Sequence, residues 1–175
     1  TEIREFKLKY NIDFIGFVDD NMFVNKKWVL EFCDEIKKEN ILWGCHARVN
    51  EVDKEILKNV YLSGCRWIGY GIESGSQTIL NKMNKKVKVE QAKEAILLTK
   101  ENNIYPNTSF IYGYPGENRD TINETIEFCQ LLDLHPRFFH SIAYPGTKLY
   151  KNNENRILNK FGSYGNGNGQ FHFPW

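Results

Sequence analysis

The chain has 175 residues, of which 41% are hydrophobic and 14% aromatic, so it can bury the core of a domain and is not expected to be disordered. Its 23 Lys and Arg residues nearly balance its 22 Asp and Glu residues, which argues against a global attraction to nucleic acid or to an anionic membrane. No apolar run approaches the roughly 20 residues of a membrane span, and the N-terminus lacks the apolar core of a signal peptide. We therefore expect a cytoplasmic protein without a membrane partner.

Hydrophobic periodicity divides the chain into short apolar runs that alternate with amphipathic stretches. The apolar runs have the length and continuity of parallel strands covered on both faces. They predict strands at residues 12–18, 41–49, 66–73, 108–112 and 137–143. The amphipathic stretches repeat apolar residues every three or four positions, as helices do. They predict helices at residues 1–10, 25–36, 53–64, 76–83, 89–101 and 120–132.

Cap residues indicate where several of these helices begin and end. Side chains that can accept a hydrogen bond from a first-turn amide stand at Asn25, Asp53, Ser76 and Asp120. Gly64 supplies the stop of the third helix. In the last helix, the spacing predicts an inward face made of Ile122, Ile126, Cys129 and Leu132.

Five strand–helix alternations predict a parallel sheet with right-handed crossovers. An open doubly wound sheet and a (β/α) barrel would both satisfy this order. The first turn contains DDNMF instead of a Gly-rich phosphate loop, and every strand ends on polar groups, so we favour the barrel. The predicted fold class is α/β, a partial TIM-like (β/α) barrel over residues 1–150. A polar, Gly/Asn-rich tail over residues 151–175 would follow, and its terminal FHFPW could dock back onto the barrel.

The four cysteines are Cys33, Cys45, Cys65 and Cys129, separated by 12, 20 and 64 positions. These separations match neither a CxxC pair nor a close-packed zinc or iron–sulfur ligand run. Cys33 and Cys129 fall on the apolar faces of predicted helices, where a free thiol behaves as a small hydrophobic group. We therefore expect structural cysteines and no metal ligands.

Polar side chains follow each predicted strand, and in a parallel sheet they would converge at one edge. They include Asp19, Asp20, Arg48, Glu73, Glu117 and Tyr144. A guanidinium can pair with a carboxylate, and carboxylates accept hydrogen bonds from an ammonium or a ribose diol. An amino acid attached to a nucleoside would satisfy both. Alternatively, Arg48 neutralises Asp20 or Glu73 in a structural ion pair, and Asp19 and Asp20 only lead into a capped helix.

Five motifs occur in a specific order and spacing between residues 12 and 150: FVDDNMFVNKK, WGCHARV, IGYGIESGS, YGYPGE and AYPGTKLY. Together they resemble the radical S-adenosylmethionine (SAM) enzymes, in particular the cobalamin-associated and elongator-like subgroup. The resemblance implies a barrel of six strand–helix units that binds SAM beside a [4Fe-4S] cluster. It also implies reductive cleavage of SAM to a 5′-deoxyadenosyl radical.

The resemblance assigns the first part of a SAM site to the ends of the first three strands. Asp19 and Asp20 would contact the amino group of the methionine moiety. Arg48 would reach its carboxylate. Glu73 and Ser74 would lie near the ribose or the amino acid.

The resemblance assigns the adenine side to the last two strands. The backbone around Ile111 and Gly113 would face the adenine ring. Glu117 would support that turn, and Tyr144 would close the loop after the last strand.

One departure from the family limits the expected activity. Family members hold the cluster with three cysteines spaced CxxxCxxC after the first strand, and this chain has no such run. We therefore expect five of the six units and no radical chemistry from the isolated chain. A missing N-terminal segment of the same protein would be its partner, and the open barrel edge would favour self-association. Cobalamin would bind only through a further domain.

The predicted function is that of a portion of a radical SAM enzyme that binds SAM at the carboxyl ends of its strands. The alternative is a catalytically inactive barrel remnant that serves as a ligand-binding or assembly module. A barrel enzyme acting on a phosphorylated sugar is less favoured, because AYPGTK is a poor phosphate loop. No feature indicates a nucleic-acid partner.

Overall fold

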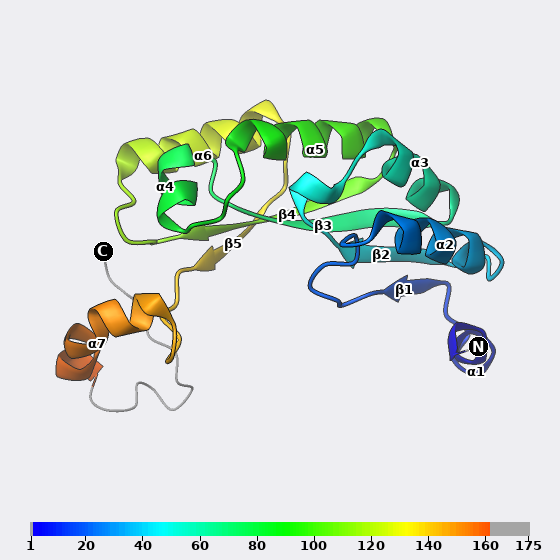
Figure 1. Ribbon diagram of the computed structural model, residues 1–175, viewed down its shortest axis with the longest axis horizontal. Helices are drawn as coiled ribbons and strands as arrows, with labels where there is room; N and C mark the ends of the chain where they lie inside the picture. The colour runs from blue at the N-terminus through cyan, green and yellow to red at the C-terminus, as the bar shows by residue number, and fades with distance from the viewer. Residues whose placement is uncertain (1, 162–175) are drawn as a thin grey trace.

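The strand–helix alternation folds into a curled half-barrel (Figure 1), and the computed structural model describes residues 2–161. The parallel strands follow one another across a single sheet as β1 (Phe14–Gly16), β2 (Leu42–His46), β3 (Cys65–Glu73), β4 (Tyr105–Tyr112) and β5 (Arg137–His140). The helices are α1 (Glu2–Tyr10), α2 (Lys26–Lys37), α3 (Lys54–Leu62), α4 (Gln77–Lys82), α5 (Val89–Glu101), α6 (Arg119–Leu131) and α7 (Lys148–Phe161), with a 3-10 turn η1 (Val49–Glu51). The predicted α/β partial barrel is confirmed.

The core lies between the sheet and the helices on its convex face (Figure 1). Its largest fully buried side chains are Trp43, Tyr70, Phe23, Phe110 and Leu57. All four cysteines are buried with free thiols, as expected for small hydrophobic groups. Among residues 2–161, no helix is long and apolar enough to cross a membrane.

The concave face carries aromatic rings that lie against the sheet. A methyl group added to Gly44 would stand 2.2 Å from the Trp67 ring, and one added to Gly69 would stand 2.2 Å from the His46 ring. Only glycine leaves room for a ring this close to the backbone. The Trp67 ring therefore lies over β2, and the His46 ring, at the carboxyl end of β2, lies over β3.

The caps of two helices confirm the sequence prediction. The Asn25 side chain accepts a hydrogen bond from the Trp28 amide at 3.1 Å and starts α2. The Asp53 side chain accepts one from the Ile56 amide at 2.8 Å and starts α3. Gly64 follows α3 with a φ of 107°, a conformation that glycine adopts without steric cost.

The predicted inward face of α6 is partly wrong. Ile122 and Ile126 are 42% and 43% exposed, whereas Thr125 is buried. The cause is a contact with a distant segment. The Thr125 hydroxyl accepts a hydrogen bond from the Gly75 amide at 3.0 Å, and the side of α6 that carries Thr125 therefore faces the sheet. Cys129 and Leu132 are buried as predicted.

The predicted cap of α6 is also wrong, since Asn118 takes this role in place of Asp120. The Asn118 side-chain Oδ1 accepts hydrogen bonds from the Asp120 and Thr121 amides, both at 3.0 Å. The Thr121 hydroxyl accepts one in return from the Asn118 amide at 2.9 Å. This reciprocal capping box satisfies three amides that have no partner inside the helix.

We expect Asn118→Ala to lower the free energy of unfolding by about 1 kcal/mol, the usual effect of removing an N-cap side chain. Asp120→Ala is the matched control, because Asp120 is exposed and offers only its charge to the helix N-terminus. Urea titration followed by circular dichroism measures both. A larger loss for Asp120→Ala than for Asn118→Ala would contradict this assignment.

Three further details differ from the sequence prediction. Ser76 occupies the N-cap position of α4, but its side chain makes no capping hydrogen bond. β1 has only three residues in place of the predicted seven-residue strand 12–18. Residues 151–161 continue α7, whereas no helix was predicted in the polar stretch that begins at residue 151. This helix starts where the Thr147 hydroxyl accepts a hydrogen bond from the Tyr150 amide at 3.2 Å. The Gly/Asn-rich stretch and FHFPW lie outside the described residues.

Candidate functional site

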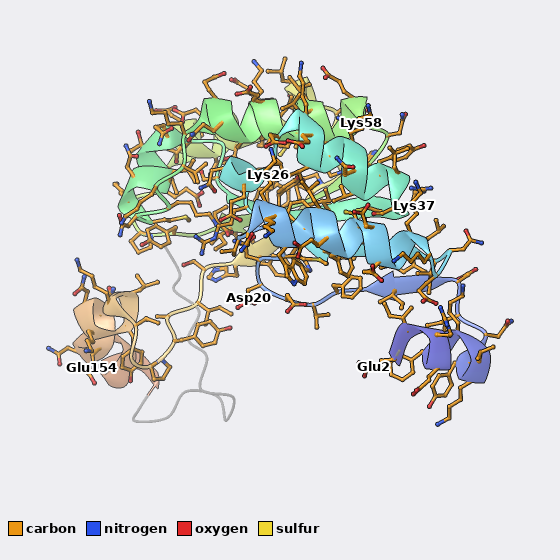
Figure 2. The ribbon with its side chains drawn as sticks, turned by 45° about the vertical axis from the view of Figure 1, so that its right-hand side comes forward. Glu2, Asp20, Lys26, Lys37, Lys58 and Glu154 are labelled. Atoms are coloured by element: carbon orange, nitrogen blue, oxygen red, sulfur yellow. The ribbon has the colours of Figure 1, made fainter. Side chains whose placement is uncertain are left out.

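A cavity of about 650 Å³ opens beside the carboxyl ends of β2 and β3. Its charged lining residues are Asp20, Arg48, Glu73, Lys85 and Lys86. Figure 2 shows Asp20 near the end of α2 that carries Lys26 and away from the end that carries Lys37. The cavity therefore lies at the edge of the sheet where parallel α/β folds place their ligands.

Glu73 ends β3 in a constrained conformation. Its φ is 71°, and the register between β3 and β4 shifts between Gly71 and Glu73. Its Oε1 accepts a hydrogen bond from the Lys85 Nζ at 2.8 Å, and both side chains are partly buried. A non-glycine residue with positive φ persists only where its surroundings hold it, and such residues concentrate at functional sites.

Arg48 lies between the end of β2 and η1, immediately before η1. Its side chain is exposed and makes no hydrogen bond or ion pair with any residue in the range 2–161. Glu73 pairs with Lys85, so the structure does not contain the Arg48–Glu73 ion pair considered as an alternative. The guanidinium is thus available to a ligand.

Asp19 and Asp20 are both exposed in the loop after β1. The Met22 amide, next in this loop, donates a hydrogen bond to the His46 carbonyl oxygen at 2.9 Å. This bond ties the loop to the end of β2. As a result Asp20 shares a cavity wall with Arg48, whereas Asp19 does not line that cavity.

Ser74 lies behind the turn that follows Glu73. Its side chain is 1% exposed, and its hydroxyl accepts a hydrogen bond from the Ser76 amide at 3.1 Å. The same hydroxyl lies 3.3 Å from the hydroxyl of Thr125 in α6. Ser74 therefore joins the turn to α6 and does not present its hydroxyl to the cavity.

The turn after β4 is built around Glu117. Its Oε2 accepts a hydrogen bond from the Gly113 amide at 2.6 Å, and Gly113 has a φ of 73°. Ile111 is half-buried in β4, and exposed Tyr144 follows β5. Glu117 thus holds the amide of Gly113 in this turn. None of Ile111, Gly113, Glu117 and Tyr144 lines the cavity of Arg48 and Glu73.

Sequence reasoning missed Lys85 and Lys86. Both belong to the segment between the predicted helices 76–83 and 89–101, where no site residue was predicted. The signal was present, because several lysines follow Glu73 within fifteen positions and after a single short helix. What the sequence does not reveal is that this turn folds back over the end of β3.

The described residues do not fit an iron–sulfur cluster. Within residues 2–161, no group of three His, Cys, Asp or Glu side chains could hold a metal ion. A hydrogen bond with Cys65, together with burial, raises the pKa of the Cys45 thiol, and burial raises the pKa of Cys129 to about 11. Cluster ligands are thiolates, whereas these thiols stay protonated near neutral pH.

The geometry defines the class of protein: an open parallel (β/α) barrel with a charged ligand cavity at the carboxyl ends of its strands. The family model described as the radical SAM superfamily matches residues 1–129. The chain belongs to the radical SAM superfamily.

Relatives with curated names cover several reactions. The chain is 33% identical over 153 residues to an uncharacterized methyltransferase of Pyrococcus horikoshii, a match that covers 86% of this chain and 33% of the relative. It is 33% identical over 130 residues to an anaerobic magnesium-protoporphyrin IX monomethyl ester cyclase of Cereibacter sphaeroides, covering 71% of this chain and 21% of the relative. The chain thus spans about a third or less of the length of these relatives.

Solved structures share the fold. The radical SAM methyltransferase TsrM from Kitasatospora setae, with cobalamin and a [4Fe-4S] cluster bound, superposes with a TM-score of 0.77 at 15% identity, covering 91% of this chain and 33% of TsrM. The cobalamin-dependent SAM radical enzyme OxsB gives a TM-score of 0.67 at 20% identity, covering 90% of this chain and 24% of OxsB. Both are similar in architecture to this half-barrel.

Proposed function

We propose that the cavity binds SAM and that the chain is the SAM-binding part of a radical SAM enzyme. The observation that carries this proposal is the unpaired guanidinium of Arg48 facing the same cavity as the carboxylates of Asp20 and Glu73. Superfamily membership supports SAM as the ligand. Arg48 would bind the carboxylate of the methionine moiety, and Asp20 would accept hydrogen bonds from its ammonium group.

Glu73 and its surroundings would hold the middle of the ligand. The Glu73 carboxylate, held by Lys85, would accept a hydrogen bond from a ribose hydroxyl. Ser74 would act as a positioning residue for Glu73, because its hydroxyl links the next turn to α6. Asp19 would complement Asp20 at the rim of the cavity.

The adenine would lie toward β4. The backbone near Ile111 and Gly113 would provide its contacts, and Glu117 would hold that backbone in place. Tyr144 would cover the site from the end of β5. The cluster would supply the electron that cleaves SAM, and its ligands would come from a further segment of the intact protein, since residues 2–161 do not fit it.

A cobalamin-binding partner domain is a further part of this proposal. It is supported by the cobalamin named for TsrM and OxsB. The rival function, an inactive barrel that binds a ligand or assembles with a partner, is supported by the same lack of cluster ligands in the described range. Detecting 5′-deoxyadenosine after reduction of the intact protein, with its cluster, would separate an enzyme from an inactive remnant.

We expect Arg48→Ala to weaken SAM binding about 10- to 100-fold, because a charge-assisted pair of roughly 1.5–3 kcal/mol is lost. Isothermal titration calorimetry of the chain with SAM measures the affinity. Arg137→Ala is the matched control, since exposed Arg137 begins β5 at the opposite edge of the sheet. Equal affinities for SAM in Arg48→Ala and the unaltered chain would remove Arg48 from the site, and no binding by the unaltered chain would refute the proposed function.

A further inference from the structure

The lysine turn, residues 82–88, is held in a defined shape over the end of β3. The side chain of Gln77, in α4, makes two hydrogen bonds at the end of this turn. The Gln77 Nε2 donates to the Val87 carbonyl oxygen at 3.3 Å, and the Gln77 Oε1 accepts from the Val89 amide at 3.0 Å. Within this turn, Lys86 has a φ of 55°. A lysine in the left-handed region is strained, and it persists only where the surrounding structure imposes the conformation.

The lysine turn is also attached to the turn after β4. The Lys82 Nζ donates a hydrogen bond to the Gly116 carbonyl oxygen at 3.2 Å. The Tyr114 hydroxyl donates one to the Lys82 carbonyl oxygen at 3.3 Å. These two bonds connect the lysine turn to the turn after β4, and the bond from Lys85 to Glu73 connects it to the end of β3. The backbone position of Lys86 at the cavity is therefore set by the fold.

The charges at the cavity exceed those that SAM requires. SAM brings one carboxylate, for Arg48, one ammonium group, for Asp20, and a sulfonium cation, which cannot neutralise a lysine. Glu73 and Lys85 neutralise each other. Lys86 lines the same cavity and has no hydrogen bond or ion pair with any residue from 2 to 161. One cation is therefore left beside the bound SAM without a partner.

We propose that Lys86 is a specificity-determining residue that binds an anionic oxygen group, a carboxylate or a phosphate, of the substrate lying next to SAM. This inference rests on the proposed function and assigns it a substrate class. A flexible surface lysine would gain little from such a contact, because fixing its side chain costs entropy. Lys86 lines a cavity, where water is partly excluded and a charge pair is stronger than on an open surface, and this offsets the entropy cost.

The test uses two small anionic probes, succinate for a carboxylate and pyrophosphate for a phosphate. The 175-residue chain, labelled with ¹³C at the lysine Cε, is saturated with SAM and titrated with each probe while NMR follows the lysine signals. Lys86→Gly identifies the Lys86 signal. We expect Lys86 to saturate at about 5- to 10-fold lower probe concentration than exposed Lys88, as one charge-assisted hydrogen bond predicts.

Two variants separate charge from backbone strain. Lys86→Gly removes the ammonium group and relieves the strain of the positive φ. We expect this variant to bind the probe about 5- to 10-fold more weakly, as measured from the NMR signal of Lys85. Asn84→Gly relieves an equal φ of 55° in the same turn without changing charge, so probe binding should stay within about twofold. Equal weakening in both variants would overturn the proposal.

The remaining outcomes also decide the matter. Identical saturation of Lys86 and Lys88 with both probes would refute a specific anion site, and preference for one probe would identify the carboxylate or the phosphate as its ligand. If Lys86→Gly weakened SAM binding as strongly as Arg48→Ala, Lys86 would be a cofactor residue and the inference would fail while the proposed function stood. The titrations are repeated without SAM, so a chain that does not bind SAM still reports on the anion site.

Discussion

Trp43→Ala is expected to lower the free energy of unfolding by about 3–5 kcal/mol, the range measured for deleting a large aromatic side chain from a core. Trp43 is fully buried, and its indole Nε1 donates a hydrogen bond to the Ser63 carbonyl oxygen at 3.1 Å. Its ring also makes edge contacts with Phe17 and Phe32, at centroid distances of 5.9 and 5.3 Å. The substitution leaves a cavity between β2 and α2 and a buried acceptor without a donor.

The matched control is Trp28→Ala in the same aromatic cluster. Trp28 stacks on Phe32 at 5.4 Å but is 47% exposed, so its removal should cost less than about 1 kcal/mol. Urea midpoints at unchanged slope measure both losses. Similar losses for the two tryptophans would show that the cluster, and not burial between sheet and helix, determines stability here.

Gly75→Ala is expected to destabilise the chain by about 2–3 kcal/mol through overpacking and to weaken SAM binding as well. The added methyl group would stand 2.7 Å from the Thr125 Cα, 2.9 Å from the Glu124 carbonyl oxygen and 2.9 Å from the Phe128 Cβ. These atoms belong to the backbone and inner face of α6, so they cannot rotate away. The turn after Glu73 must separate from α6, which moves Glu73 relative to the cavity.

Gly16→Ala is the control for this prediction. Its added methyl group would meet only the Trp67 ring at 3.8 Å, an ordinary van der Waals contact. We expect its stability to change by less than about 0.5 kcal/mol. Thermal melts and SAM calorimetry check both variants, and a Gly75→Ala chain with unchanged stability and affinity would show that α6 can shift without cost.

Local interactions explain why much of the fold could be predicted. The caps Asn25 and Asp53 bond to amides three positions away, and the stop at Gly64 depends on its own φ. The range of α5, Val89–Glu101, follows from its periodicity. These interactions join residues that are close in sequence, so residue propensities and the spacing of apolar residues are enough to predict them.

The predicted buried face of α6 failed because of a contact between distant segments, whereas the two predicted caps failed through competition between neighbouring groups. The face of α6 that is buried is decided by the bond from the Gly75 amide to Thr125, fifty positions along the chain. The N-cap of α6 is Asn118 and not Asp120. Both side chains carry an oxygen acceptor, and sequence spacing does not tell which of the two caps the helix. Ser76 stands at a cap position, but its amide binds Ser74 and its hydroxyl makes no bond.

The sequence by itself determined the parallel half-barrel and the placing of Asp20, Arg48 and Glu73 at strand ends, because strand order and apolar runs direct these residues to one edge. Only the tertiary structure decided which of the charged groups at this edge form ion pairs. It pairs Glu73 with Lys85, leaves Arg48 and Lys86 without partners among the described residues, and places both at one cavity. The physical reason is that ion pairing depends on distances of a few ångströms, which the folding back of the lysine turn sets and which sequence spacing does not encode.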